Sequence, residues 1–287
     1  MTAVEASSAD VELRARATGF VRARVRALGG RRVIEVDARG ERNAGALVRS
    51  DGQSIAAGAR AAREQRLPLL IRIASSGADA GEGVSALDGW AGAAKEITAN
   101  SGVVPSIAIV SGPTVSGPAL MLGLVDHVIM TSEAYAFVSG PMMVEEFTGV
   151  PMSKEELGGP SVHDRTSGVA SFVAGDEEEA EALAAELLAF LPDHTDDHPP
   201  TIASADPVER PTPDAYEVLP PSANGSYDVR DIVGAVVDDG YLLEPHANWA
   251  ANLVTAVATI GGQPVGIVAN QPQTVAGTLD ILSLIHI

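Results

Sequence analysis

Two glycine-containing turns, each following an apolar run, hold the residues of this chain best suited to chemistry. The apolar run at 69–74 ends in SSG at 75–77, and the run at 106–110 ends in SGP at 111–113, shortly before Ser116 and Gly117. A turn that leads into the N terminus of a helix leaves backbone N–H groups free for an anion or a polarised carbonyl oxygen. We therefore expect ligands to meet backbone amides at these strand ends.

The Ser116 region also admits a capping role or a nucleophilic one. Ser116 can cap a helix that begins at Gly117 and has Pro118 in its first turn. Ser116 can also be imagined as a nucleophile, but no G-x-S-x-G elbow supports a serine hydrolase. The histidines and acids that would have to assist it are His127, His163, Asp126 and Asp164.

Alternating strands and helices must position these turns. Arg- and Ala-rich composition predicts a first helix over 10–28, ending at Gly29-Gly30. Further helices are predicted over 54–65, 84–100 and 116–124, and strands over 32–37, 69–74, 106–110, 125–131 and 134–138. Strand, glycine turn and helix in alternation are typical of a βαβ architecture with ligand-binding loops at the strand ends.

A segment dense in Pro, Asp and His divides the chain at 192–222. It follows an acidic helix predicted over 176–191, whose apolar residues form one stripe. Beyond it we predict a helix over 227–239 and two strands, 254–260 and 264–269, joined by Gly261-Gly262. The expected organisation is a first domain over 1–191, a linker over 192–222 and the beginning of a second domain over 223–281.

Charge excludes several classes of partner. The 287 residues carry 19 Lys and Arg against 38 Asp and Glu, a net charge of −19, so we expect neither nucleic acid nor an anionic membrane as a partner. Most of the basic residues lie within residues 1–72. Their guanidinium groups suit an anionic ligand, although a solvated helix face is the simpler interpretation for Arg14, Arg16, Arg22, Arg24, Arg26, Arg31 and Arg32.

The chain contains no cysteine, which removes disulfides, thiolate zinc sites and a cysteine nucleophile. It has no run of 18 apolar residues, and its first 30 residues contain no apolar stretch of signal-peptide length. A metal site at His194 and His198, in the acidic linker, is a minor alternative, and we expect no metal. We predict a soluble cytoplasmic protein.

Longer motifs connect the chain to a known family. SGPMMVEEFTG at 139–149 is followed by VPMSKEELGGPSVHDRTSGVASFVAGDEEEA at 150–180, and YDVRDIVGAVVDDG and IGGQPVGIVANQP occur beyond the linker. Together with 75–83 and 111–126, these blocks resemble the carboxyltransferase (beta) subunit of biotin-dependent acyl-CoA carboxylases, of the propionyl-CoA and methylmalonyl-CoA carboxyltransferase type. That family typically has FVTGP, EELGG and SGVAHFVA stretches in this order, which makes the resemblance specific.

The resemblance implies an α/β, crotonase-like (ClpP/crotonase) fold of ββα superhelical units, followed by the start of a second similar domain. It also implies carboxyl transfer from carboxybiotin to an acyl-CoA, acetyl- or propionyl-CoA, through an enolate held by backbone-amide oxyanion holes. Biotin would be carried by a partner protein, coenzyme A would form part of the substrate, and no metal would be needed. The implied partners are acyl-CoA, a biotin carboxylase and biotin carrier subunit, and other copies of the chain in a homo-oligomer.

The resemblance further implies a set of site residues. The family's DSGGARIQEG stretch aligns with ASSGADAGEG at 74–83, which assigns the backbone N–H groups of Ser76 and Gly77 to an oxyanion hole. The implied substrate contacts are Gly112, Ser116, Gly117 and Gly140. The chain departs from the pattern at Ala74, Ser76 and Asp79. The Cβ of Ser76 restricts a tight turn, and Asp79 in place of Arg weakens the attraction for an anionic ligand.

Two further functions stay open. A non-catalytic acyl-CoA-binding or regulatory subunit of a carboxylase complex would follow if the altered loop no longer holds an oxyanion. An enoyl-CoA hydratase or isomerase of the same fold would instead use a carboxylate as general base, for which the candidates are Glu82, Glu145 and Glu146.

The end of the chain carries an unusual sequence. Residues 282–287, LSLIHI, match an in-frame translation of the transposase adapter end used in sequencing libraries. We expect these six residues to be adapter-derived, the second domain to be truncated after Ile281, and the fragment alone to be inactive.

Overall fold

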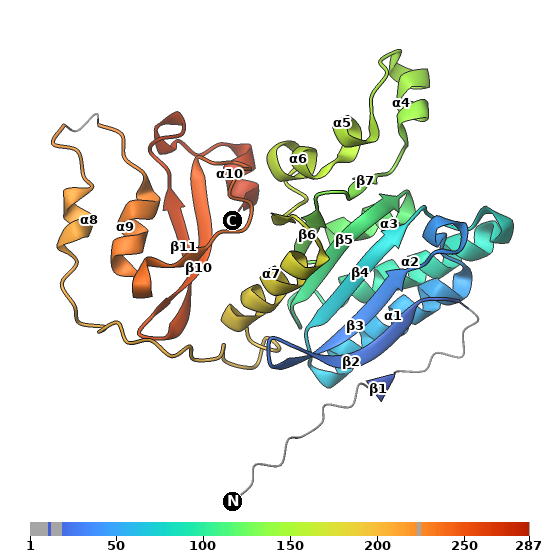
Figure 1. Ribbon diagram of the computed structural model, residues 1–287, viewed down its shortest axis with the longest axis horizontal. Coiled ribbons are helices and arrows are strands. Elements are labelled where there is room, and N and C mark those ends of the chain that lie inside the picture. Colours follow the sequence, from blue (N-terminus) through green and yellow to red (C-terminus); the bar gives the residue numbers. More distant parts are fainter. Residues whose placement is uncertain (1–10, 13–18, 223–224, 287) are drawn as a thin grey trace, which may run out of the picture.

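The computed structural model describes residues 11–12, 19–222 and 225–286 and shows a mixed α/β structure with two sheets (Figure 1). The larger sheet has the order β1-β2-β3-β4-β5-β6-β8, with β7 paired to β5. Its strands are β1 (Val11–Glu12), β2 (Arg22–Leu28), β3 (Arg31–Arg39), β4 (Leu69–Ser75), β5 (Ser106–Val115), β6 (His127–Thr131), β7 (Tyr135–Phe137) and β8 (Phe172–Ala174). Strands β3, β4, β5, β6 and β8 run parallel, as the predicted βαβ architecture requires.

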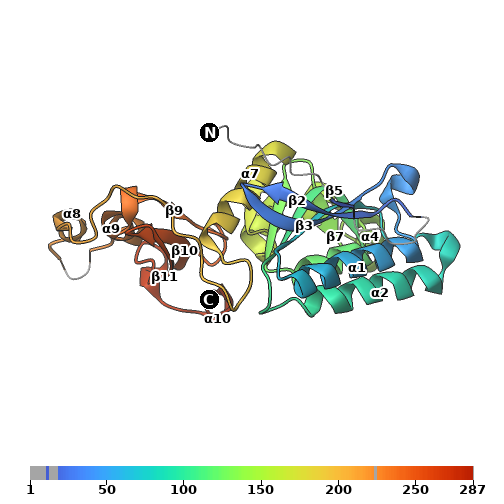
Figure 2. The ribbon, with the colours of Figure 1, turned by 90° about the horizontal axis from the view of Figure 1, so that it is seen from below.

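Helices cover both faces of the larger sheet (Figure 2). Helices α1 (Arg49–Gln65) and α2 (Val84–Thr98) pack on one face, and α7 (Glu177–Phe190) packs on the other. The first interface buries Ile55 of α1 and Ile97 of α2 against Ile71 and Ile73 of β4. The second buries α7 residues such as Leu187 against the opposite face of the same strands. Burial on both faces explains why the central strands are almost continuously apolar.

The predicted first helix is wrong, because residues 22–28 form strand β2. Gly29 and Gly30, with φ of 56° and 82°, close a two-residue hairpin turn between β2 and β3, where we had expected the end of a helix. Alternate residues of the segment, Val21 and Ala23, are buried in the core. Cross-strand pairing and burial thus override the helix-forming composition of this Arg- and Ala-rich segment. Residues 13–18 of the predicted helix lie outside the described residues.

The predicted turn at 111–113 is also wrong, because β5 continues through it to Val115. The pairing of β4 with β5 shifts between Ile73, which lies opposite Val110, and Ser75, which lies opposite Thr114. Two extra residues are therefore accommodated on β5. The Ser-Gly-Pro signal marks an irregularity inside a strand, which is a recognised position for glycine and proline.

An arm of short helices leaves the sheet after β7 (Figure 1). It contains α4 (Pro141–Thr148), α5 (Lys154–Gly158) and α6 (Pro160–Val162), and it returns to the sheet at β8. The shorter helix α3 (Gly117–Met121) follows β5 directly. Single helical turns occur at Arg42–Gly45, Ala80–Glu82, Leu122–Leu124, His163–Ser167, Asp238–Gly240 and Val275–Gly277.

The segment after α7 leads to a second, three-stranded antiparallel sheet of order β11-β10-β9. Its strands are β9 (Leu242–Leu243), β10 (Leu253–Ile260) and β11 (Gln263–Asn270), and its helices are α8 (Pro213–Glu217), α9 (Val229–Val236) and α10 (Ile281–His286). The Asp238 carboxylate accepts the N–H groups of Gly261 (2.8 Å) and Gly262 (2.7 Å), which fixes the β10–β11 turn. The strands predicted over 254–260 and 264–269 are therefore confirmed, whereas the predicted linker carries one short helix, α8.

Candidate active site

The loops after β4 and β5 meet at the carboxyl edge of the parallel sheet. Ser75, the last residue of β4, pairs with Thr114 near the end of β5, so the two strands end at nearly the same level of the sheet. A Cβ placed on Gly77 would lie 3.4 Å from the Ser116 Cβ and 3.4 Å from the Val115 carbonyl oxygen. The fold thus brings together the Ser76–Gly77 and Ser116–Gly117 pairs, which are 40 residues apart in the sequence.

The backbone at Ser76 and Gly77 is already hydrogen-bonded within the chain. The Ser76 N–H donates to the Ala44 carbonyl (3.0 Å), and the Gly77 N–H donates to the Ser75 hydroxyl (3.2 Å). Gly77 has φ of +116°, a conformation that side-chain-bearing residues rarely adopt. Both partners are fixed within the chain, because the Ser75 hydroxyl is buried and itself donates to the Gly45 carbonyl (2.7 Å).

The Ser116–Gly117 pair offers a different arrangement. Ser116 occupies the N-cap position of α3 and Pro118 lies in its first turn, as expected, but the Ser116 side chain makes no capping hydrogen bond. Its N–H donates to the Phe137 carbonyl (3.0 Å), and its φ of +63° is unusual for a residue with a Cβ. Within the described part of the chain, the Gly117 N–H has no hydrogen-bond partner. This amide, at the first position of α3, is therefore a helix N–H group without an intrahelical partner, and Gly117 itself is buried.

A tryptophan that sequence analysis did not assign to the site packs against Gly117. A Cβ on Gly117 would lie 3.0 Å from Nε1 and Cε2 of Trp90, so the indole of α2 covers the glycine directly. The Trp90 Nε1 atom is buried and has no hydrogen-bond partner among the described residues. The only sequence signal for this contact was the rarity of tryptophan, since Trp90 is one of two in the chain.

The remaining predicted substrate contacts lie on neighbouring elements. Gly112 lies inside β5, where a Cβ would approach the Ala74 Cβ of β4 to 3.2 Å. Gly140 is the N-cap residue of α4, three residues beyond the Phe137 carbonyl that binds Ser116. The glycine and serine positions of the two loops, together with Gly140, therefore border one edge of the sheet, whereas Gly112 faces the adjacent strand.

The segment 43–49 encloses the Ser76–Gly77 loop and was missed by sequence analysis. The Leu47 N–H donates to the Gly77 carbonyl (2.8 Å), and the Ser76 hydroxyl donates to the Asn43 carbonyl (2.9 Å). Asn43 and Ala44 both have positive φ, 50° and 51°. Asn is the non-glycine residue that tolerates this conformation best, so Asn43 was the one available signal.

Asp79, which departs from the family pattern, has structural partners. Its carboxylate accepts the Gly81 N–H (2.8 Å) and the Asn43 side-chain amide (3.1 Å). It also borders a cavity of about 220 Å³ together with Asn43 and Arg22. The carboxylate therefore ties the 43–49 segment to the β4 loop and leaves a negative charge at the border of this cavity.

The carboxylates considered for a hydratase lie on the loop after β4 and on helix α4. The Glu82 carboxylate accepts the Arg49 N–H (2.6 Å) at the start of α1. Glu145 and Glu146 lie on helix α4 of the projecting arm. Among the described residues no hydrogen bond joins these three carboxylates to the Gly77 or Gly117 loop, so no observation favours general-base catalysis there.

The histidines considered for a serine hydrolase are held elsewhere. His127 is the first residue of β6, at the amino end of the parallel strands, whereas Ser116 lies beyond their carboxyl ends. His163 contacts the Ser167 hydroxyl (2.7 Å) through Nδ1 and the Ala136 carbonyl (2.8 Å) through Nε2. A catalytic triad around Ser116 is therefore not formed, and His163 has the structural role considered for it.

Three of the arginines considered for an anionic ligand, Arg24, Arg26 and Arg31, pair with acids instead. Arg24 and Arg26 contact Glu35 of β3 at 2.6 and 2.5 Å, and Arg31 pairs with Asp193. Arg14 and Arg16 lie outside the described residues. Over the described ranges there is no group of three or more His, Asp or Glu side chains that could hold a metal ion. No helix in the same ranges is long and apolar enough to cross a membrane.

The chain is similar in sequence to known carboxyltransferase subunits. The chain is 40% identical over 217 residues to the methylmalonyl-CoA carboxyltransferase 12S subunit of Propionibacterium freudenreichii subsp. shermanii, covering 75% of this chain and 41% of that protein. It is 36% identical over 223 residues to the propionyl-CoA carboxylase beta chain of Saccharopolyspora erythraea, covering 75% and 41%. The chain thus spans less than half the length of these relatives.

A solved structure shows the same fold. The crystal structure of the transcarboxylase 12S hexamer with bound methylmalonyl-coenzyme A superposes with a TM-score of 0.89 and 32% identity, covering 96% of this chain and 56% of that one. The predicted crotonase-like fold and the family resemblance are therefore confirmed. The family described as "Carboxyl transferase domain" matches residues 5–286, and the chain belongs to this family.

Proposed function

We propose that the protein represented by this chain transfers a carboxyl group between carboxybiotin and an acyl-CoA. The observation that carries the proposal is the meeting of the Gly77 and Gly117 loops at the carboxyl edge of the sheet, with the Gly117 N–H free of partners within the described residues. Backbone donors held in a rigid fold are suited to a negative charge that develops during reaction. Family membership supports the same chemistry.

In the proposed reaction, the Cα–H bond of the acyl-CoA breaks and its electron pair moves onto the thioester oxygen as an enolate. Carboxybiotin supplies CO2, and the nitrogen that it leaves on biotin receives the proton. The enolate carbon then forms a C–C bond with CO2, which restores the thioester carbonyl. The task of this chain is to hold the enolate oxygen, and losing one donor of that kind costs about 3–4 kcal/mol in the barrier.

The two loops differ in the hydrogen bonds that their N–H groups already make, and we propose different roles for them. The Gly117 N–H, which has no partner among the described residues, is the first proposed donor, and the Gly77 N–H becomes a second donor only when it leaves the Ser75 hydroxyl, which the Gly45 carbonyl holds in place. The Ser76 N–H is proposed from the family resemblance as part of the oxyanion hole. It must first break its hydrogen bond to the Ala44 carbonyl. Gly112, Ser116 and Gly140 remain proposed substrate contacts around this pair.

The proposal extends to the partners of the complete protein. Biotin would be carried covalently on a partner, loaded by a biotin carboxylase subunit, and coenzyme A would enter as part of the substrate. We propose a homo-oligomer whose sites form between the first and second domains of neighbouring subunits. The hexamer assembly named for the transcarboxylase 12S core supports the homo-oligomer.

The test follows carboxyl transfer in reverse, with methylmalonyl-CoA labelled in its free carboxyl group and with free biotin as acceptor. The protein in its complete length should transfer label to biotin and release propionyl-CoA in equal amounts. The 287-residue chain should bind the acyl-CoA and transfer nothing. Loss of CO2 without labelled biotin, or hydration of crotonyl-CoA, would refute the proposal.

A regulatory subunit would behave differently in the same assay. It would bind acyl-CoA at full length and still transfer no label, even when its partner subunits are added. If the full-length protein does transfer label, substitution of Gly117 tests the assigned donor, because Gly117→Ala places a Cβ against Trp90 and should abolish transfer. Gly92→Ala, on an open face of α2, is the matched control and should leave transfer unchanged.

A further inference from the structure

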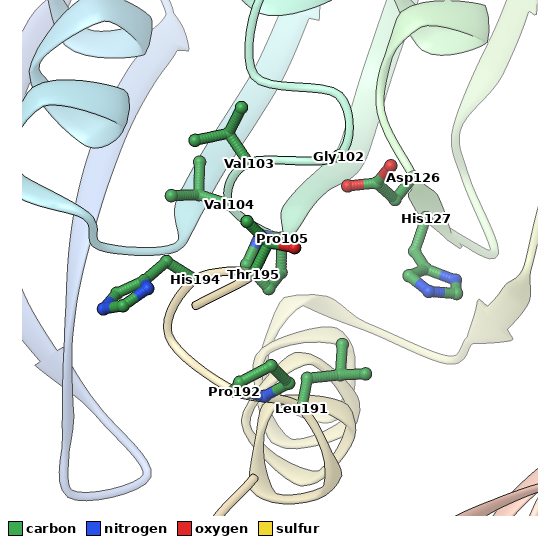
Figure 3. Close-up of a pocket in the computed structure, with 10 residues that line it drawn as sticks. All are labelled: Gly102, Val103, Val104, Pro105, Asp126, His127, Leu191, Pro192, His194 and Thr195. Atoms are coloured by element: carbon green, nitrogen blue, oxygen red, sulfur yellow. The ribbon is translucent and has the colours of Figure 1, made fainter. Parts of the chain in front are cut away.

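A separate cavity lies at the opposite edge of the sheet from the Gly77 and Gly117 loops. It has a volume of about 260 Å³ and is lined at the start of β5 and β6 and at the turn after α7 (Figure 3). Because β5 and β6 run parallel, their first residues, Ser106 and His127, mark the amino edge of the sheet. The proposed carboxyl transfer makes no use of this cavity.

The walls of the cavity are mostly apolar. Val103, Val104 and Pro105 come from the turn between α2 and β5, and Leu191 and Pro192 come from the end of α7. The volume is below the range of about 300–1,000 Å³ that is usual for drug-sized ligands. The cavity therefore suits a small molecule with an apolar body.

One end of the cavity carries the exposed carboxylate of Asp126, only one oxygen of which is held by hydrogen bonds within the described residues. The Asp126 Oδ2 atom accepts the N–H (2.8 Å) and the hydroxyl (2.7 Å) of Ser106, which fixes the side chain in place. No hydrogen-bond partner of Asp126 Oδ1 is found among the described residues. Figure 3 shows Asp126 and His127 on one side of the cavity and Val103 and Val104 across from them.

The charged and titratable groups at the cavity favour a cation. No Lys or Arg is among the residues that line it, and the neighbouring guanidinium of Arg31, which donates to the Leu191 carbonyl (2.5 Å), is paired with Asp193, so an anionic ligand would meet Asp126 with little compensation. Burial lowers the pKa of His127, which keeps this imidazole uncharged at neutral pH. The His194 side chain points away from Asp126 and His127 (Figure 3). The net charge of −19 adds a general attraction for cations.

We propose that this cavity binds a small apolar amine, whose ammonium group donates to Asp126 Oδ1 while its apolar body packs against Val103, Val104 and Leu191. Such a ligand bridges two segments that are already connected, since the Thr195 N–H donates to the Val103 carbonyl (3.0 Å). Occupation of the cavity therefore holds the turn after α7 against the start of β5. The proposal does not depend on the carboxyl-transfer function.

The test titrates phenethylamine into the 287-residue chain and follows the ligand by saturation-transfer NMR. Hydrocinnamate, which has a similar apolar body and the opposite charge, is titrated in parallel. We expect saturable binding of the amine and none of the carboxylate. Equal binding of the two, or no saturable binding of the amine, would overturn the proposal.

Two substitutions locate the binding. Asp126→Asn keeps an acceptor for Ser106 and removes the charge, so the amine should bind about tenfold more weakly. Val103→Trp fills the cavity and should remove binding. It tests the site independently if Asp126→Asn disturbs the fold. The matched control is Asp88→Asn, which removes one exposed charge on α2, where Asp88 pairs with Arg49 at 3.0 Å. Binding that is equally weak in the Asp88 and Asp126 variants, or undiminished in Val103→Trp, would contradict the assigned site.

Discussion

Gly77 is the residue whose backbone limits the candidate site most directly. Its φ of +116° excludes ordinary side chains, although the surrounding space would admit a Cβ at ordinary contact distance, 3.4 Å from its neighbours. We expect Gly77→Ala to lower the free energy of unfolding by about 1–3 kcal/mol through backbone strain alone. Urea denaturation measures the change.

Gly92→Ala is the matched control for that substitution. Gly92 lies in α2, and a Cβ there would meet no atom within 4 Å. An alanine should therefore stabilise the helix by about 0.5–1 kcal/mol. Identical effects of the two substitutions would show that the conformation of Gly77 is not strained for other residues.

Ser116 stores strain beside Gly77. A residue with a Cβ at φ of +63° costs about 1–3 kcal/mol, and glycine would relieve this at an entropic cost of about 0.5–1 kcal/mol. We expect Ser116→Gly to raise the free energy of unfolding by about 1 kcal/mol, measured by urea denaturation, and Ser116→Ala to leave the strain in place. A Ser116→Gly chain less stable than Ser116→Ala would argue against strain at this residue.

At the scale of residues, the sequence predicted the two glycine loops but not the backbone conformations of the residues around them. The glycine motifs located the two loops, because glycine at a strand end carries its own conformational signal. The positive φ of Ala44 and Ser116 had no such signal, since both conformations depend on hydrogen bonds to residues distant in sequence, the Ser76 N–H with the Ala44 carbonyl and the Ser116 N–H with the Phe137 carbonyl. The pairing of Trp90 with Gly117 likewise depends on how α2 packs near α3.

At the scale of elements, a buried ion network holds α7 and the β2–β3 hairpin together. Glu35 of β3 is completely buried and contacts Arg24 (2.6 Å), Arg26 (2.5 Å) and, more distantly, Arg72 (4.0 Å). The Arg26–Glu35 contact is an ion pair without the alignment of a hydrogen bond. Arg26 and Arg72 also reach Glu181 of α7 at 2.8 and 2.7 Å. The guanidinium groups of Arg26 and Arg72 are thus shared between the sheet and α7.

Glu35→Ala should destabilise the chain by about 3–5 kcal/mol, because it leaves buried guanidinium groups without their shared carboxylate. The control is Asp88→Ala, which removes the exposed pair with Arg49 and should cost less than about 1 kcal/mol. Urea denaturation at one pH and one salt concentration compares the two. Equal, small losses would mean that water replaces Glu35 without penalty.

The same network explains the largest error of the sequence analysis. Composition alone favours a helix at residues 22–28, since Arg and Ala are strong helix formers. The strand forms because Gly29-Gly30 closes a hairpin and because Glu35 lies across from Arg24 in the β2–β3 register. Pairing across a hairpin is a tertiary interaction, and a helical propensity of a few tenths of a kcal/mol per residue does not compete with it. The helices α1, α2 and α7, whose own apolar periodicity faces a core, were correctly predicted.

At the scale of the whole molecule, a histidine cluster joins the larger sheet to the C-terminal segment. The Ser171 hydroxyl lies 3.3 Å from His127 Nδ1 and 3.3 Å from His246 Nε2, and the His246 N–H donates to the Ser171 carbonyl (2.8 Å). His286 of α10 lies edge-on to His246, with ring centroids 5.6 Å apart. Trp249 completes the junction by packing against Gly168.

This junction should weaken in acid. Burial, followed by repulsion from His286 and His127, lowers the pKa of His246 from 6.5 to about 4. Between these two values the unfolded chain binds the proton and the folded chain does not, so stability is complete above about pH 6.5 and falls as the pH decreases toward 4. The loss attributable to His246 is at most about 3 kcal/mol. Urea denaturation at about pH 7, 6 and 5 measures it.

Carboxylates also titrate toward the lower end of that range, so the informative quantity is the difference between variants. His246→Asn keeps a polar side chain and removes the titration, and it should flatten the decline in unfolding free energy between about pH 7 and 5. His198→Asn, at an exposed position of the segment after α7, should retain the full decline. If both variants follow the unsubstituted chain, acid acts elsewhere. If the unfolding free energy becomes independent of pH only in the His246 variant, protonation of His246 accounts for the loss of stability in acid.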